Sequence, residues 1–281
     1  METTVKNIVT IGASAGGIAA ITKLLSTVDK DLNAALFIVI HISKKSRTDV
    51  ILTQLQKYTA FKCVIPKDGE DILNQIVYLA PSDCHMMVRR GKILIRKGAL
   101  ENHWRPSIDV LFRSAAAAYG CNVTGIVLTG LLDDGTSGMS AIKKSGGTCI
   151  VQDPAEADFP DMPRNVLQNV AVDYNVPIAD MGYILSDLLS RGDSDMYDTP
   201  TDVLLENDVT MRMNNNFGDL VNKQLKGVEE SLWVAIRMME ERKNLLNSMS
   251  DQNEEAKEMA DQMITHIARL KKMLQEIGKK S

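Results

Sequence analysis

Ser14 stands between glycines in the stretch Gly12-Ala13-Ser14-Ala15-Gly16, which follows a short apolar run and precedes a helical pattern. The spacing is G-x-S-x-G, in which a tight strand-to-helix turn holds a serine hydroxyl above the edge of a sheet. Backbone N–H groups and the positive dipole end of the following helix would stabilise an oxyanion there. The motif predicts a serine nucleophile, provided that a base lies within reach.

A glycine-rich turn after a first strand also binds phosphate in dinucleotide-binding proteins. That function needs a glycine at the position of Ser14 and an acidic residue at the end of the second strand. The second apolar run, "ALFIVIH" at 35–41, ends instead in His41. Because both required features are missing, the nucleophile is the favoured interpretation of this turn.

His41 is the candidate base for Ser14. It ends an apolar strand pattern, so it lies at the carboxyl edge of a parallel sheet, where Ser14 also lies and where ligands bind in open α/β sheets. The other three histidines have weaker positions: His85 begins a predicted hairpin, His103 lies in "ENHWRPSID", and His266 occupies a solvated position of a predicted tail helix.

Asp133 and Asp134 supply a carboxylate at a third strand end, after "VTGIVLTG" at 123–130. A buried aspartate accepting the Nδ1–H of His41 would fix its tautomer and stabilise the imidazolium. The alternative is a helix N-cap, because "DDGTSG" is good capping chemistry, and one of the two aspartates can serve there. The chain order Ser, His, Asp differs from the Ser, Asp, His order of α/β-hydrolases.

The elements that must position these residues alternate between strands and helices, which is typical of βαβ units on a parallel sheet. "HMMVRRGKILIRK" at 85–97 predicts an antiparallel hairpin. We therefore expect an α/β fold with a doubly wound, mostly parallel sheet and one antiparallel hairpin. Strands are expected at 7–12, 35–41, 62–66, 76–80, 123–130, 147–152 and 169–174, and helices at 17–28, 47–58, 106–119, 136–146 and 178–191.

The character of the chain changes near residue 192. Residues 196–209 are rich in Asp and have little patterned apolar content, so we interpret them as a linker between a catalytic domain at 1–195 and a tail at 210–281. Between Val221 and Ile277 apolar residues recur in alternating steps of four and three, in two series. This pattern predicts a helical hairpin or coiled coil that associates with itself, with a second copy, or with a partner helix.

Composition excludes several classes of protein. The 281 residues carry a net charge of −4, so nucleic acid is a poor default partner. The four cysteines show no C-x-x-C spacing, and no metal site is expected. The start of the sequence has no signal-peptide pattern, and no window reaches 18 uninterrupted apolar residues, so we expect a cytoplasmic protein without membrane insertion.

Residues 8–191 closely resemble the catalytic domain of the chemotaxis protein-glutamate methylesterases, the CheB family. The matching stretches are "IGASAGG", "IHIS", "YLAPSDCH", "RPSIDVLFRSAA", "VLTGLLDDGTSG" and "VQDPAEADFPDMP", in this order. The resemblance implies Ser14 as nucleophile, His41 as base and Asp134, rather than Asp133, as the acidic member.

The resemblance further implies hydrolysis of glutamate γ-methyl esters on the cytoplasmic helices of a chemoreceptor or related signalling protein, with deamidation of glutamine in some members. We expect the backbone N–H groups of Ala15 and Leu131 to hold the oxyanion, and no metal or organic cofactor. Arg105 is a candidate for contacting the substrate or shaping the cleft, with a surface ion pair as the alternative.

Three departures from the family pattern stand out. Leu132 replaces a glycine of the family's turn before the aspartate, which would crowd the oxyanion region or alter the turn. The sequence starts at its first predicted strand, so we expect the control by a receiver domain that is usual in the family to be absent. The helical tail is not part of the family's catalytic domain. These departures support an alternative function, a catalytically weak or inactive methylesterase fold that acts as a signalling scaffold through its tail.

Overall fold

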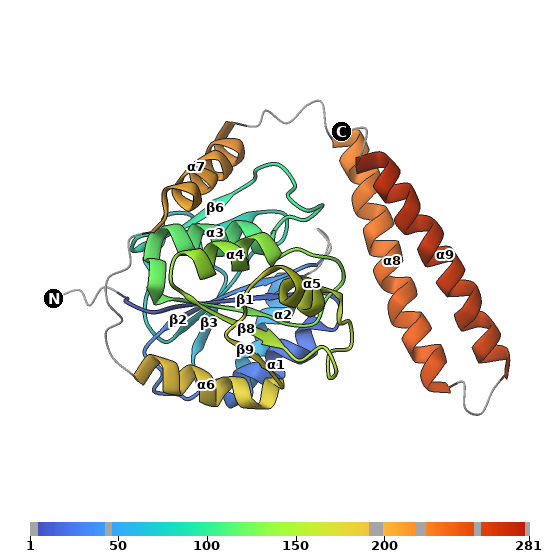
Figure 1. Cartoon of the computed structure of the whole chain (residues 1–281), viewed down its shortest axis with the longest axis horizontal. Coiled ribbons are helices and arrows are strands. Elements are labelled where there is room, and N and C mark those ends of the chain that lie inside the picture. Colours follow the sequence, from blue (N-terminus) through green and yellow to red (C-terminus); the bar gives the residue numbers. More distant parts are fainter. Residues whose placement is uncertain (1–4, 43–46, 191–198, 217–222, 250–253, 279–281) are drawn as a thin grey trace. The chain divides into compact units, whose positions relative to one another are not determined.

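The computed structural model describes residues 5–42, 47–190, 199–216, 223–249 and 254–278. The chain divides into two compact units, Met1–Phe217 and Gly218–Ser281, and each is considered by itself. Within the first unit, seven parallel strands form one sheet and a two-stranded antiparallel hairpin lies apart from it (Figure 1). The predicted doubly wound, mostly parallel α/β fold with a hairpin is therefore confirmed.

The seven strands lie in the order β3-β4-β2-β1-β7-β8-β9. Strands β1 and β2 are buried along their whole length, because helices cover both faces of the sheet. The strands are β1 (Ile8–Ala13), β2 (Ala35–Ile40), β3 (Lys62–Val64), β4 (Ile76–Leu79), β7 (Val123–Val127), β8 (Thr148–Gln152) and β9 (Tyr174–Val176), and the hairpin is β5 (His85–Arg89) with β6 (Lys92–Arg96).

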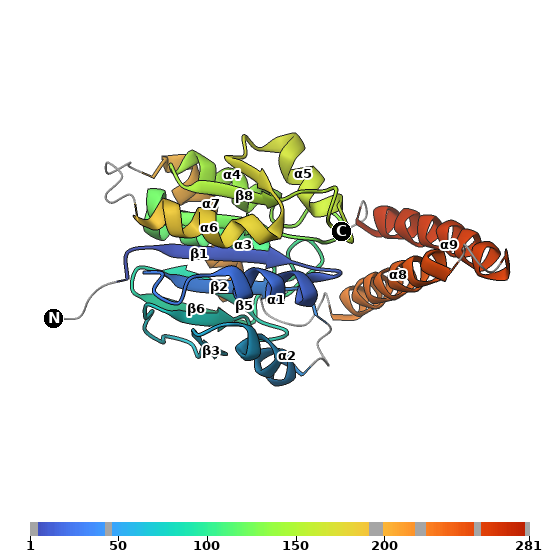
Figure 2. The same cartoon turned by 90° about the horizontal axis from the view of Figure 1, so that it is seen from below.

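Two apolar cores sandwich the sheet. One is made with α1, α2 and α6, the face toward the viewer in Figure 2. The other is made with α3, α4, α5 and the hairpin, and Val203 of α7 belongs to it. The helices of this unit are α1 (Gly17–Thr27), α2 (Thr48–Leu55), α3 (Ile108–Tyr119), α4 (Thr136–Lys144), α5 (Asp161–Asn169), α6 (Ile178–Ser190) and α7 (Thr201–Asn216), with single 3₁₀ turns at Gln56–Tyr58 and Gly120–Asn122.

The strand order reverses direction between β1 and β7, which is where open α/β sheets bind ligands. Ala13 pairs with Ile40, and Gly12 pairs with both Val39 and Val127. The three central strands therefore end at the same level, and the residues that follow them emerge at one edge of the sheet.

Two predictions differ from the structure by more than three residues. The last strand, predicted at 169–174, is β9 at Tyr174–Val176, because α5 continues to Asn169 and Val170 and Val172 pack on the core without pairing. The predicted linker at 196–209 and tail start at 210 are wrong: α7 spans Thr201–Asn216 and belongs to the first unit. This helix was not predicted because its sequence has little apolar periodicity: one buried valine, Val203, and several polar contacts attach it to the rest of the unit. Residues 191–198 lie outside the described part of the chain.

The second unit is a helical hairpin of α8 (Lys223–Met249) and α9 (Glu254–Gly278). On α9 the predicted seam positions Ala260, Ile267 and Leu274 are buried. On α8 the buried positions are Trp233, Ile236 and Glu240, one residue after the predicted 232, 235 and 239, which are half-buried. Glu240 is tolerated in the seam because it forms ion pairs with Lys243 on its own helix and Lys271 on α9.

Candidate active site

Ser14 follows β1 directly and opens the turn into α1. Its N–H donates to the Thr129 carbonyl (3.0 Å), and its carbonyl accepts from the N–H of Gly17 (2.9 Å). Gly16 has a left-handed backbone with φ of 72°, which a residue with a side chain adopts only at a cost. The turn therefore holds Ser14 by its backbone and leaves the hydroxyl to point across the edge of the sheet.

Gly130, after β7, closes in on this turn from the neighbouring strand. A Cβ at this position would lie 2.8 Å from the Cβ of Ser14 and 2.1 Å from the sulfur of Met162. Only glycine allows this approach, and the Gly130 backbone is held in place by the N–H bond it donates to the Phe159 carbonyl (2.9 Å).

His41, after β2, lies between the other two candidate residues and is 1% exposed. Its Nδ1 is 3.2 Å from Ser14 Oγ, and its Nε2 is 2.7 Å from Asp134 Oδ2. Because a carboxylate only accepts, the Nε2 carries the proton, and Nδ1 is then the acceptor for the serine hydroxyl. The expectation that the aspartate receives the Nδ1–H is wrong: the ring is turned so that Nε2 faces Asp134.

Asp134 is the most densely hydrogen-bonded side chain of the site. Besides the His41 Nε2–H, its carboxylate accepts the N–H groups of Ile108 (2.8 Å) and Asp109 (3.1 Å), the Ser107 hydroxyl (2.9 Å) and the Asn102 amide (2.8 Å). Burial would raise the pKa of this carboxyl, but the bond and charge of His41, with these donors, lower it below its ordinary value. Asp134 therefore stays ionised and holds the imidazole.

Asp134 and Asp109 cap each other's helices. Asp134 accepts from the first turn of α3, while Asp109 Oδ1 accepts from the N–H groups of Gly135 (3.0 Å) and Gly138 (2.6 Å) at the start of α4. Burial and the charge of Asp134 raise the pKa of Asp109 well above its ordinary value. Of the two predicted roles, Asp134 orients the base, whereas the side chain that accepts from the start of the helix after "DDGTSG" is Asp109 rather than either aspartate of that stretch. Asp133 is exposed.

A tight turn at Glu101–Trp104 brings two further side chains, those of Asn102 and Trp104, into contact with the site. Glu101 and Trp104 exchange both backbone hydrogen bonds, and Asn102 and His103 between them have φ of 50° and 68°, as in a type I′ turn. The Trp104 ring stacks on His41 with a centroid separation of 4.3 Å and an interplanar angle of 7°. This contact covers the imidazole and fixes its plane.

Asn102 joins the two buried aspartates through one amide group. Its Nδ2 donates to Asp134 Oδ1 (2.8 Å) and to Asp109 Oδ2 (2.6 Å). Sequence reasoning missed Asn102, Trp104 and Asp109, although all lie in or beside "ENHWRPSID". An Asn followed by Gly would have signalled the turn, but His103 occupies that position.

The proposed oxyanion donors belong to one small apolar cluster. Ala15, Leu131 and Phe159 are buried together, with Leu132 packed against them. Within the described part of the chain, the N–H groups of Ala15 and Leu131 have no hydrogen-bond acceptor, which leaves them available to a ligand. Leu132 adopts a left-handed backbone with φ of 72°, so it keeps the conformation that a glycine would take most easily.

Arg105 is engaged away from this cluster. Its guanidinium donates to Asp83 Oδ1 through Nε (3.1 Å) and Nη2 (2.6 Å), and to the Gly98 carbonyl through Nη1. The side chain is 11% exposed, so the ion pair is largely buried rather than on the surface. A contact between Arg105 and substrate stays a prediction, and the structure gives this residue a role in holding its own loop.

His85 ties the same loop to β5. Its Nε2 donates to the Ala99 carbonyl (2.6 Å) and its Nδ1 accepts from the Ser107 N–H (3.3 Å). Burial lowers the pKa of His85 to about 4, so the ring is neutral at physiological pH.

The described residues also bear on the requirements of a metal site and of a membrane-spanning helix. No group of three His, Cys, Asp or Glu side chains among them is placed to hold a metal ion, and none of their helices combines the length and apolar character needed to cross a membrane. None of the four cysteines, all of which lie in the described residues, forms a disulfide.

The fold and this constellation define a doubly wound α/β protein with Ser, His and Asp at three neighbouring strand ends. The sequence model of the family described as CheB methylesterase matches residues 9–185. The chain belongs to the CheB methylesterase family.

Relatives and one solved structure agree with this assignment. A Leptospira interrogans protein is 36% identical over 167 residues, 59% of this chain and 86% of its own length. A Methanosarcina mazei protein named protein-glutamate methylesterase/protein-glutamine glutaminase 2 is 33% identical over 188 residues, 64% of this chain and 51% of the relative. The crystal structure of the Thermotoga maritima CheB methylesterase catalytic domain matches with a TM-score of 0.62 and 28% identity, over 65% of this chain and 98% of that one.

Proposed function

We propose that the protein hydrolyses glutamate γ-methyl esters on methylated chemoreceptors or related signalling proteins, and that it also deamidates glutamine side chains. The observation that carries the proposal is the continuous chain of contacts from Ser14 Oγ through His41 to Asp134. The names of the Methanosarcina mazei and Sulfurimonas denitrificans relatives, which include both activities, support the choice of substrate.

In the proposed mechanism, Ser14 Oγ attacks the ester carbonyl carbon while Nδ1 of His41 takes its proton. The imidazolium is stabilised by the ionised Asp134 and keeps its orientation through the Nε2–H bond. The tetrahedral oxyanion is held by the N–H groups of Ala15 and Leu131. His41 then gives the proton to the leaving methanol, or to ammonia in deamidation, and activates a water that releases the glutamate carboxylate.

The test is methanol release from a methylated receptor fragment. Ser14→Ala is expected to lower kcat roughly 10³-fold or more, because the nucleophile is lost while the fold is kept. Ser26→Ala is the matched control, since Ser26 lies on the exposed side of α1 and bonds only to the Lys23 carbonyl. An unchanged rate in Ser14→Ala would show that this residue is not the nucleophile, and a wild-type protein without turnover would favour the scaffold alternative.

The helical hairpin supports a second proposal, association of the tail with another helix from a second copy or a partner. Met238 and Leu245 of α8 and Met259 and Met273 of α9 are exposed, and the predicted seam residues of α8 are only half-buried. Met238 and Leu245 are seven residues apart and Met259 and Met273 fourteen, so each pair lies on one face of its helix, at the spacing by which coiled-coil helices contact a partner. Light scattering of the full chain should give a mass above one copy, and Leu245→Glu should reduce it. If the protein stays monomeric at high concentration, self-association is excluded and a helix of another protein remains as the proposed partner.

A further inference from the structure

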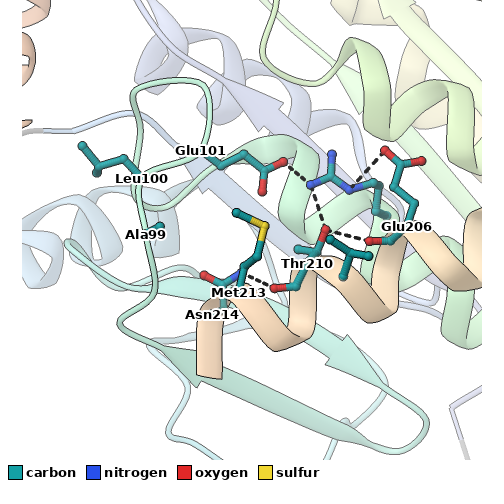
Figure 3. Close-up of a pocket in the computed structure, with 9 residues that line it drawn as sticks. Ala99, Leu100, Glu101, Glu206, Thr210, Met213 and Asn214 are labelled. Carbon is teal, nitrogen blue, oxygen red and sulfur yellow. Dashed lines mark hydrogen bonds and ion pairs between the residues drawn. The ribbon is translucent and has the colours of Figure 1, made fainter. Parts of the chain in front are cut away.

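Arg113 of α3 forms a buried polar cluster beneath α7. Its side chain is 5% exposed, and its Nη2 donates to Glu101 and to the hydroxyl of Thr210 (3.3 Å). Nε of the same guanidinium is 3.8 Å from Glu206. Figure 3 shows Glu101 on the loop facing Glu206 and Thr210 on α7. These residues line a cavity of about 230 Å³. A buried guanidinium keeps a fixed place only when such partners surround it.

Glu101 connects the Arg113 cluster to the active site. It is the first residue of the turn whose ends, Glu101 and Trp104, exchange backbone hydrogen bonds. The same turn directs Asn102 to Asp134 and lays Trp104 on His41. The Glu101 carboxylate is therefore connected, through the backbone of this turn, to the two side chains that contact the imidazole and its carboxylate partner.

The last turn of α7 also touches the chain leading into this loop. Asn214 is 9% exposed, and a Cβ added at Gly98 would lie 1.7 Å from its Oδ1 and 2.7 Å from its Cα. The backbone of the loop and the backbone of α7 thus lie in direct contact at Gly98, in addition to the side-chain contacts at Arg113.

We infer that α7 is part of the active-site scaffold, with Thr210, Arg113 and Glu101 as positioning residues for the catalytic histidine and aspartate. The expected effect on catalysis rests on the proposed function. The expected effect on the position of the loop rests on the contacts described above and not on the proposed function. Helix α7 lies outside residues 9–185, which match the family, and is followed along the chain by α8. The alternative is that the cluster only neutralises a buried charge, without effect on the site.

The experiment uses the full chain and compares Thr210→Val, which keeps the shape and removes the hydroxyl, with Thr210→Ser, which keeps the hydroxyl. Glu101→Gln removes the charge at the loop end of the cluster. Asp202→Asn is the control on α7, because the Asp202 ion pair with Lys144 is exposed and does not touch Arg113. Circular dichroism verifies that each variant is folded.

Two readouts separate this inference from the proposed function. The first is kcat and KM for ester hydrolysis, where Thr210→Val and Glu101→Gln should lower kcat roughly three- to thirtyfold with KM nearly unchanged. The second is the emission of Trp104 in a Trp233→Phe background, since these are the two tryptophans of the chain. The same variants should shift this emission to the red, because Trp104 leaves its buried place on His41, while Thr210→Ser and Asp202→Asn should leave both readouts unchanged.

Emission and kcat that are the same in Thr210→Val, Glu101→Gln and Asp202→Asn as in the wild type would overturn the inference and leave the proposed function untouched. Shifted emission in these variants of a protein that hydrolyses no ester would support the positioning of the loop by α7 and contradict the proposed function.

Discussion

At the scale of single residues, the site contains two buried carboxylates that accept hydrogen bonds from one amide group but differ in the direction of their pKa shifts. Asn102 donates to both Asp134 and Asp109, yet the pKa of Asp134 is lowered and that of Asp109 is raised. The difference arises because His41 faces only Asp134. Pairs of titratable groups whose pKa values are moved apart mark distinct roles, and here the ionised carboxylate serves the base.

His85 predicts a dependence of stability on pH. Its pKa is about 4 in the folded protein and about 6.5 in an unfolded chain, so the unfolded state binds a proton first as the pH falls. The stabilising contribution of neutral His85 is complete above the unfolded value and should fall by about 2 kcal/mol between about pH 7 and about pH 5.

The measurement is urea unfolding of the wild type and of His85→Asn at both pH values. Taking the difference removes the other titrating groups, among them Asp109, whose raised pKa acts in the opposite direction. The stability gap between the two proteins should narrow at the lower pH. A gap independent of pH, or an NMR titration of the His85 ring near its ordinary value, would contradict the assignment.

At the scale of elements, three helix N-termini organise the site. α1 begins beside Ser14, α3 begins where Asp134 accepts its N–H groups, and α4 begins where Asp109 does the same. Each N-terminus carries partial positive charge, which favours a carboxylate or a developing oxyanion. The N–H groups at the start of α3 therefore help to keep the buried Asp134 ionised. Among its side-chain partners, His41, Ser107 and Asn102, only the His41 ring can become a cation.

The cap formed by Asp109 can be tested by its removal. Asp109→Ala leaves the N–H groups of Gly135 and Gly138 without their acceptor in the core, so we expect the free energy of unfolding to fall by roughly 2–4 kcal/mol. Asp161→Ala in the first turn of α5 is the control, with an expected loss below about 1 kcal/mol because only the helix dipole is affected. Equal losses in the two variants would rule out the capping role.

At the scale of the whole molecule, the boundary between the units falls after α7 rather than before it. Val203 is 1% exposed in the core of the first unit, and Arg113 depends on Thr210 and Glu206 of the same helix. A shortened chain that stops before α7 would expose an apolar site and leave a buried cation short of partners.

Two fragments test this boundary by thermal unfolding. The fragment 1–217 is expected to keep the midpoint of the corresponding transition in the full chain. The fragment 1–199 should unfold roughly 5 °C lower or more, since burial of a valine side chain alone contributes about 1.5–3 kcal/mol. If both fragments unfold at one temperature, α7 does not stabilise the first unit.

The amino-acid sequence by itself determined the sheet and the approximate place of the chemistry. Continuous apolar runs predict strands that are covered on both faces, and parallel strands bring the residues that follow them to one edge. Ser14, His41 and Asp134 could therefore be placed together from the sequence, since each directly or closely follows such a run.

Tertiary structure alone decided how these residues meet. The ring orientation of His41 depends on Trp104, and Asp134 is held by Asn102, which comes from a turn with no glycine to signal it. The docking of α7 depends on Arg113, almost a hundred residues earlier in the chain, and the buried face of α8 is set by Trp233 and by the Glu240–Lys271 ion pair. Each of these contacts joins segments that are distant in the sequence. The local periodicity of the sequence predicts helices and strands, but it does not predict which distant side chain a residue contacts.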